Sequence, residues 1–170
     1  IRRAADMHAT IPVNEINNRG IVRNAILCLA GRFLNDPNLI DIGIRDFHRE
    51  PIRVFNEKDG QINEGTGPDA NYSGTSYVYA YLYRVFSGDS SIDQKMIDGL
   101  RWATRIFDPR GMVTLFGSST RMPIPDERKI ADYLPAMERY ADLLPHFSWL
   151  IDHGYLDNKA LGGCHHCASP

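Results

Sequence analysis

Apolar residues recur every three or four positions along most of the chain, which is the spacing of one helical face. The first two such stretches cover about 14–34 and 37–49. We expect Asn14 or Asn17 to cap the first helix and Pro37 to occupy the first turn of the second. Further helices are predicted over about 76–86, 92–107, 127–144 and 145–154.

A turn separates two short extended runs in the middle of the chain. Lys58-Asp59-Gly60 lies between the runs 54–57 and 61–64. An Asp-Gly step favours a tight turn because glycine accepts a positive φ, so the sequence predicts a β-hairpin here. Residues 65–74 are rich in glycine and polar residues and are predicted to form an irregular loop, and 112–116 is predicted as a short strand.

These elements predict an all-α fold of paired antiparallel helices with small β-hairpin excursions and loops on one face. The 170 residues are enough for a single domain, 1–170, and we expect 160–170 to be a flexible tail. The composition, 43% apolar and 24% charged, is typical of a globular protein. A net charge of -2 without a Lys/Arg run argues against nucleic acid as a partner. No apolar run reaches the roughly 18 residues that span a membrane.

Three short motifs resemble the α/α-toroid polysaccharide lyases, the group of alginate lyases and heparinase II/III-like enzymes. They are Asn17-Asn18-Arg19-Gly20 at the start of a helix, Asp-Gly-Gln-Ile-Asn-Glu-Gly at 59–65, and Asn-Tyr-Ser-Gly at 71–74 before a tyrosine-rich helix. The resemblance covers roughly 14–121, and Arg19 stands where the family often has a histidine. It implies an α/α toroid, of which this chain would form a part or which it would complete by self-association.

The resemblance implies β-elimination on a polysaccharide that contains uronic acids. The carboxylate beside the C5 proton must be neutralised, and Asn18, Arg19 and Asn71 carry suitable donors. A base must then remove the proton, and Tyr72 and Tyr77 are the candidates if a nearby arginine lowers the pKa of the phenol. The residues expected to bind the acidic polysaccharide or oligosaccharide are Arg19, Glu64, Asn71, Trp102, Arg105 and Arg121.

Two other functions stay open at this point. Glu64 and Asp69 are two carboxylates on one segment, which is what a glycoside hydrolase of similar shape would need. A non-catalytic helical-repeat module that binds a glycan or a protein is the second alternative. The product separates these functions, since a lyase creates a 4,5-unsaturated uronyl end, a hydrolase creates only a reducing end, and a binding module creates neither.

The cysteines divide into one helical residue and a pair in the tail. Cys28 lies in an apolar run and is expected to be a small buried side chain. Cys164, His166 and Cys167 have donor atoms that suit zinc, but adjacent side chains cannot all converge on one ion, so we expect no cofactor, with zinc or calcium as the alternative. The compartment is not visible in the sequence, and a secreted or periplasmic location would suit the substrate.

Overall fold

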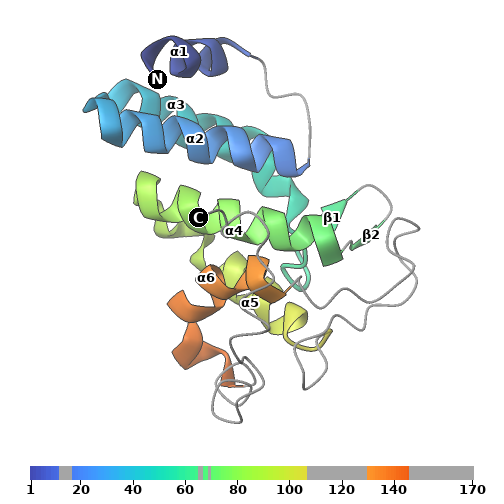
Figure 1. Cartoon of the computed structure of the whole chain (residues 1–170). Coiled ribbons are helices and arrows are strands. Elements are labelled where there is room, and N and C mark those ends of the chain that lie inside the picture. Colours follow the sequence, from blue (N-terminus) through green and yellow to red (C-terminus); the bar gives the residue numbers. More distant parts are fainter. Residues whose placement is uncertain (12–16, 65–66, 69, 107–129, 146–170) are drawn as a thin grey trace, which may run out of the picture.

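The computed structural model describes residues 1–11, 17–64, 67–68, 70–106 and 130–145, and over these residues the chain is mostly helical (Figure 1). The α-helices are α1 (Arg2–Thr10), α2 (Asn18–Leu34), α3 (Pro37–Arg49), α4 (Ala70–Ser87), α5 (Asp93–Ala103) and α6 (Ile130–Arg139). Short 3-10 helices are η1 (Pro51–Val54), η2 (Ser90–Ile92) and η4 (Ala141–Leu143). The predicted helical fold class is therefore confirmed at this level.

The α2–α3 hairpin forms as predicted, because residues next to the helix ends determine where each helix begins and stops. The Asn17 side chain caps α2 by accepting from the backbone N–H of Arg19 at 2.9 Å. Asn35 ends α2 in the left-handed conformation at φ 51°, and Asp36 then caps α3, with Pro37 in its first turn. The two helices pack closely at Gly43, where an added Cβ would lie 2.7 Å from the Cys28 sulfur.

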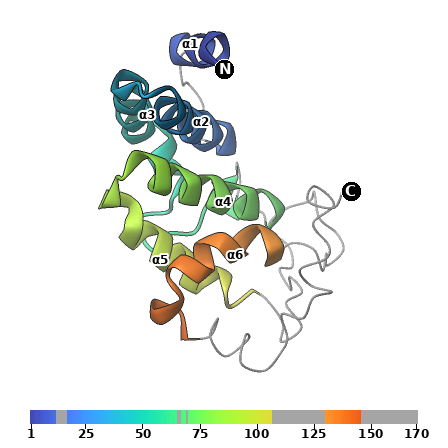
Figure 2. The same ribbon diagram turned by 60° about the vertical axis from the view of Figure 1, so that its left-hand side comes forward.

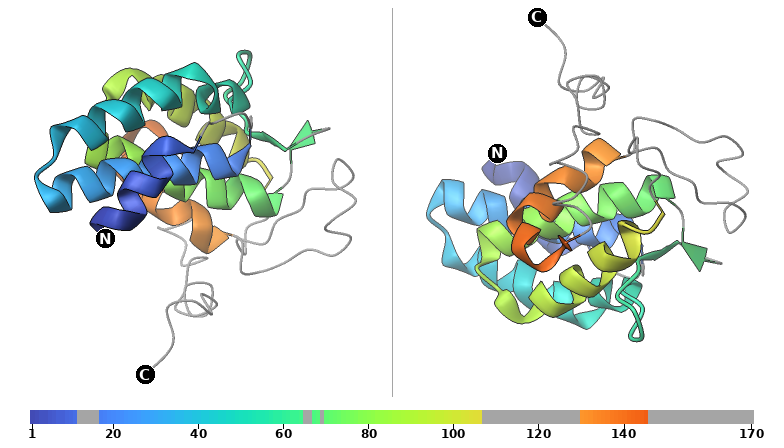
Figure 3. Two further views of the ribbon diagram at one scale, coloured as in Figure 1. Left: turned by 90° about the horizontal axis from the view of Figure 1, so that it is seen from above. Right: turned by 90° about the horizontal axis from the view of Figure 1, so that it is seen from below.

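Helices α2, α4 and α6 run in the same direction, while α3 and α5 run the opposite way (Figures 1 and 2). The C-terminal ends of α2 and α4 are joined by Arg32, whose Nε donates to the carbonyl of Phe86 at 2.8 Å. The rings of Tyr77 in α4 and Tyr133 in α6 lie 5.4 Å apart. Seen from above, α1 lies over the α2–α3 pair (Figure 3), where Ala5 joins a small cluster of buried residues with Leu27.

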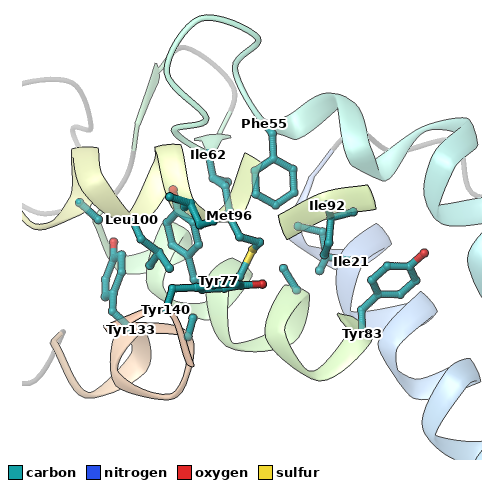
Figure 4. Close-up of a cluster of buried hydrophobic side chains, with 14 of the residues drawn as sticks. Ile21, Phe55, Ile62, Tyr77, Tyr83, Ile92, Met96, Leu100, Tyr133 and Tyr140 are labelled. Atoms are coloured by element: carbon teal, nitrogen blue, oxygen red, sulfur yellow. The ribbon is translucent and has the colours of Figure 1, made fainter. Parts of the chain in front are cut away.

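The main core is centred on α4, which lies between the other helices (Figure 4). Tyr77 and Tyr83 of this helix are fully buried. The ring of Tyr83 stacks on Phe47 of α3 at 3.9 Å between centroids. Met96 and Leu100 of α5 belong to the same cluster of buried side chains. Burial of each such side chain contributes roughly 1.5–3 kcal/mol, so contacts between helices far apart in sequence hold this arrangement.

The structure corrects the predicted hairpin and loop. The predicted runs 54–57 and 61–64 do not form a two-stranded sheet: across the turn at 58–60 they are joined by one antiparallel bridge, Phe55 with Ile62, and Val54 ends the 3-10 helix η1. The two-residue strands β1 (Asn63–Glu64) and β2 (Gly67–Pro68) pair instead across 65–66. Helix α4 starts at Ala70 and not after Gly74, and buried Ser73 in its first turns donates to the Ile62 carbonyl at 3.1 Å.

The later helices are shorter than predicted. Helix α5 starts at Asp93, directly after η2. Asp89 caps η2 by accepting from the backbone N–H of Ser91. Helix α6 ends at Arg139, four residues after the proline inside it. The predicted strand at 112–116 and tail at 160–170 lie outside the described residues, as does all but Pro145 of the predicted helix at 145–154. No helix in the described part of the chain is long and apolar enough to cross a membrane.

Candidate functional site

The first turns of α2 and α4 carry the candidate residues Asn18, Arg19 and Tyr72. Since α2 and α4 are parallel and packed together, these turns lie at the same end of the helix pair (Figure 1). Asn18 and Tyr72 are half-buried, and Arg19 is exposed. The structure thus brings the amide and guanidinium of two adjacent residues to the same end as a phenol that lies more than fifty positions later in the sequence.

The helix starts add to the electrostatics of this end. The first N–H groups of an α-helix have no partner within the helix, so each start carries a partial positive charge. At α2 the Asn17 side chain satisfies the N–H of Arg19. The guanidinium of Arg19 adds a full positive charge beside it. The start of α2 thus combines a capped helix N-terminus with an exposed arginine.

Tyr77 lies in the core and not at the open end. It is fully buried, and its hydroxyl donates to the Gly60 carbonyl at 3.4 Å. Burial, together with Tyr133 and Asp59 nearby, raises the pKa of Tyr77 well above its ordinary value of 10.0. The condition set for Tyr77 as the base, a pKa lowered by a nearby arginine, is therefore not met, because the ring is buried between the helices.

The candidate residues Glu64 and Asn71 lie before and after β2 in the sequence, close to the start of α4. Glu64 is in β1 and pairs with Gly67, and Asn71 is the second residue of α4. Arg121, Cys164, His166 and Cys167 lie outside the described residues, as does Asp69. Within the described part, no group of three or more His, Cys, Asp or Glu residues is placed to hold a metal ion.

A second cluster of candidates lies at the end of α5. Trp102 is half-buried and packs against the core. Arg105, just beyond the helix, is exposed. A cavity of about 340 Å³ is lined by Arg101, Thr104, Arg105, Leu144 and Pro145. The structure therefore separates the indole of Trp102, which serves the core, from the arginine, which faces a hollow in the surface.

Sequence reasoning missed a polar network at the opposite end of α4. The Asp89 carboxylate accepts from the Tyr83 hydroxyl at 2.7 Å and lies 2.7 Å from Nε2 of His48. The serine hydroxyl of Ser91 lies 3.3 Å from the same nitrogen. Both groups meet His48 at one nitrogen, so this is not the relay of a nucleophilic triad, in which the histidine uses both nitrogens. His48, whose side chain is exposed, ties α3 to the α4–α5 turn.

A comparison of the chain with protein-family models, with curated protein sequences and with solved structures finds no match. The interpretation of the site therefore rests on its own geometry and on the short motifs. The geometry places Asn18, Arg19 and Tyr72 together at one end of two parallel helices.

Proposed function

We propose that the chain forms part of an α/α toroid and acts as a polysaccharide lyase on a uronic-acid-containing polysaccharide. The helix directions support the toroid. Parallel α2, α4 and α6 would be inner helices, and antiparallel α3 and α5 would be the outer helices that return the chain. In such an arrangement every inner helix begins at the same end, which brings residues from distant parts of the sequence to one cleft.

The observation that carries the proposal is the shared position of Asn18, Arg19 and Tyr72 at this end. β-Elimination requires the substrate carboxylate to be neutralised, so that the C5 proton becomes acidic. The amide of Asn18 and the guanidinium of Arg19 are donors suited to a carboxylate, and the positive ends of α2 and α4 reinforce them.

Tyr72 then serves as the base. Its phenolate oxygen takes the C5 proton, the electron pair of the C5–H bond forms the C4–C5 double bond, and the C4–O4 bond breaks. The departing O4 receives a proton, which the newly protonated phenol of Tyr72 supplies. Tyr72 is half-buried in the first turn of α4, at the end of the helix pair where Arg19 lies in the first turn of α2, so a phenol and a guanidinium are available at one end for the base and for the carboxylate. Tyr77 has no part in this step, because its hydroxyl is enclosed in the core.

The test is incubation of the protein with alginate, heparin, hyaluronate and polygalacturonate, and with uncharged dextran as a control. Two products are followed, the ultraviolet absorbance of the 4,5-unsaturated uronyl end and the number of reducing ends. The proposal expects both to rise together with at least one acidic polymer and neither with dextran. Reducing ends without the unsaturated group would overturn it in favour of a hydrolase. Binding without either product would indicate a binding module.

A further inference from the structure

The cavity at the end of α5 is not used by the elimination step described above. It has a volume of about 340 Å³ and lies between the last turn of α5 and the segment that follows η4. Since α5 is antiparallel to α4, this last turn lies toward the end of the molecule where α4 begins (Figure 1). The cavity is therefore built on a different helix from the one that carries Tyr72.

Two arginines line the hollow, Arg101 in the last turn of α5 and Arg105 just beyond the helix. Arg101 is held in place by two long contacts, Nε to the Leu143 carbonyl at 3.4 Å and Nη1 to Asp98 at 3.5 Å. These leave part of its five N–H donors unused. Arg105 is exposed, and no residue in the described part of the chain accepts a hydrogen bond from its guanidinium.

The remaining walls combine a hydroxyl with an apolar surface. Thr104 is buried, and its hydroxyl donates to the Arg101 carbonyl at 2.9 Å, so its oxygen lone pairs remain able to accept a hydrogen bond. Leu144, which is buried, and Pro145 supply the apolar side. A ligand that fits needs a planar anionic group for the arginines, a hydroxyl for Thr104 and an apolar flank. A sugar that carries a carboxylate has all three.

We propose that this hollow is a subsite for one uronic acid residue of the substrate, away from the bond that is cleaved. Arg101 and Arg105 hold the carboxylate by charge-assisted hydrogen bonds, Thr104 accepts from a sugar hydroxyl, and the C–H face of the ring lies on Leu144 and Pro145. This assignment rests on the proposed function for its substrate. The binding chemistry stands on the residues of the hollow alone.

The experiment is an NMR titration with D-glucuronate, which has no glycosidic bond to cleave, followed through the side-chain Nε–H signals of arginine and the backbone amide of Thr104. D-Glucose and inorganic sulfate are titrated in parallel. We expect glucuronate to shift the signals of Arg101, Thr104 and Arg105 and to bind more tightly than either control. Equal binding of glucose would overturn the role of the arginines, and equal binding of sulfate would overturn the role of the sugar ring.

Two variants test whether glucuronate binds in this hollow. Arg105→Ala is expected to weaken glucuronate binding by about tenfold or more, the loss that follows from removing a charged hydrogen-bonding partner. Arg49→Ala removes the same charge from an exposed position at the end of α3 and is expected to change nothing. Unchanged binding in Arg105→Ala would refute the subsite while leaving elimination untouched. Absence of unsaturated product, with glucuronate still bound here, would refute the lyase and not the subsite.

Discussion

The hydroxyl of Tyr77 on α4 occupies the space that a side chain on Gly99 of α5 would need. The backbone of Gly60 closes the same space from the turn at 58–60. Gly99 therefore allows α5, α4 and the turn to approach one another. A methyl group here has to push apart the hydroxyl of a buried tyrosine and a backbone segment.

Gly99→Ala is expected to lower the free energy of unfolding by about 1–3 kcal/mol, the usual cost of overpacking a core. Urea unfolding followed by circular dichroism measures the change. The double variant Gly99→Ala with Tyr77→Phe should recover only part of it, because the Gly60 backbone still blocks the methyl. A single variant more stable than wild type, as alanine is in an open helix, would show that the contact is not close.

The buried ion pair between Arg23 of α2 and Asp46 of α3 gives the second prediction. Their charged atoms are 3.0 Å apart, and Nε of Arg23 also donates to the His8 carbonyl, which ties α1 to the pair. Asp46→Ala leaves the guanidinium buried without its counter-charge and is expected to cost about 3–5 kcal/mol. Thermal or urea unfolding measures it.

A matched control is available in the exposed pair of Arg53 and Glu50, at 3.3 Å. Its arginine side chain is 63% exposed, so Arg53→Ala is expected to change stability by less than about 1 kcal/mol. Similar losses for Asp46→Ala and Arg53→Ala would contradict the view that burial makes the first pair important.

Acid stability should depend on Asp89. Burial raises the pKa of this carboxyl, but hydrogen bonds from Ser91, Tyr83 and His48 outweigh burial and lower the pKa from 3.8 to about 2. The unfolded chain therefore takes up the proton at a higher pH than the folded chain does. The network contributes roughly 2 kcal/mol of stability that is complete above about pH 5 and is lost as the pH falls from about 4 to about 2.

Unfolding free energies of wild type and Asp89→Asn between pH 2 and pH 6 measure this contribution. The variant is expected to be less stable at pH 6 and to converge toward wild type as the solution becomes acidic. A constant difference across the range would mean that the carboxylate does not gain its low pKa from folding.

Local sequence predicted the fold well wherever helix boundaries are set by neighbouring residues. Asn17 and the Asp36-Pro37 step define α2 and α3 with no help from the rest of the chain. The start of α4 was not predictable in this way. Residues 70–74, predicted as part of a loop, are helical, and the buried hydroxyl of Ser73 donates to the Ile62 carbonyl, a contact across eleven residues.

The candidate site was predictable in part, because some of its residues stand where local sequence marks the start of a helix. Asn18, Arg19 and Tyr72 belong to motifs at helix starts, and parallel packing of α2 and α4 places them at one end. The burial of Tyr77 depends on Tyr133 and Gly99, which no pattern within α4 reveals. Networks such as His48 with Asp89 join residues 41 positions apart and leave no local signal.

Tyr72 and Tyr77 of α4 test the account most directly, because the resemblance made both of them candidate bases while the structure buries only Tyr77 fully. Tyr72→Phe and Tyr77→Phe each remove one hydroxyl, and the initial rate of unsaturated uronyl formation is compared with that of wild type on the best acidic polymer. We predict a loss of about 100-fold or more for Tyr72→Phe, the usual contribution of a general base, and a rate near wild type for Tyr77→Phe. A Tyr72→Phe variant that folds and retains the wild-type rate would contradict the account.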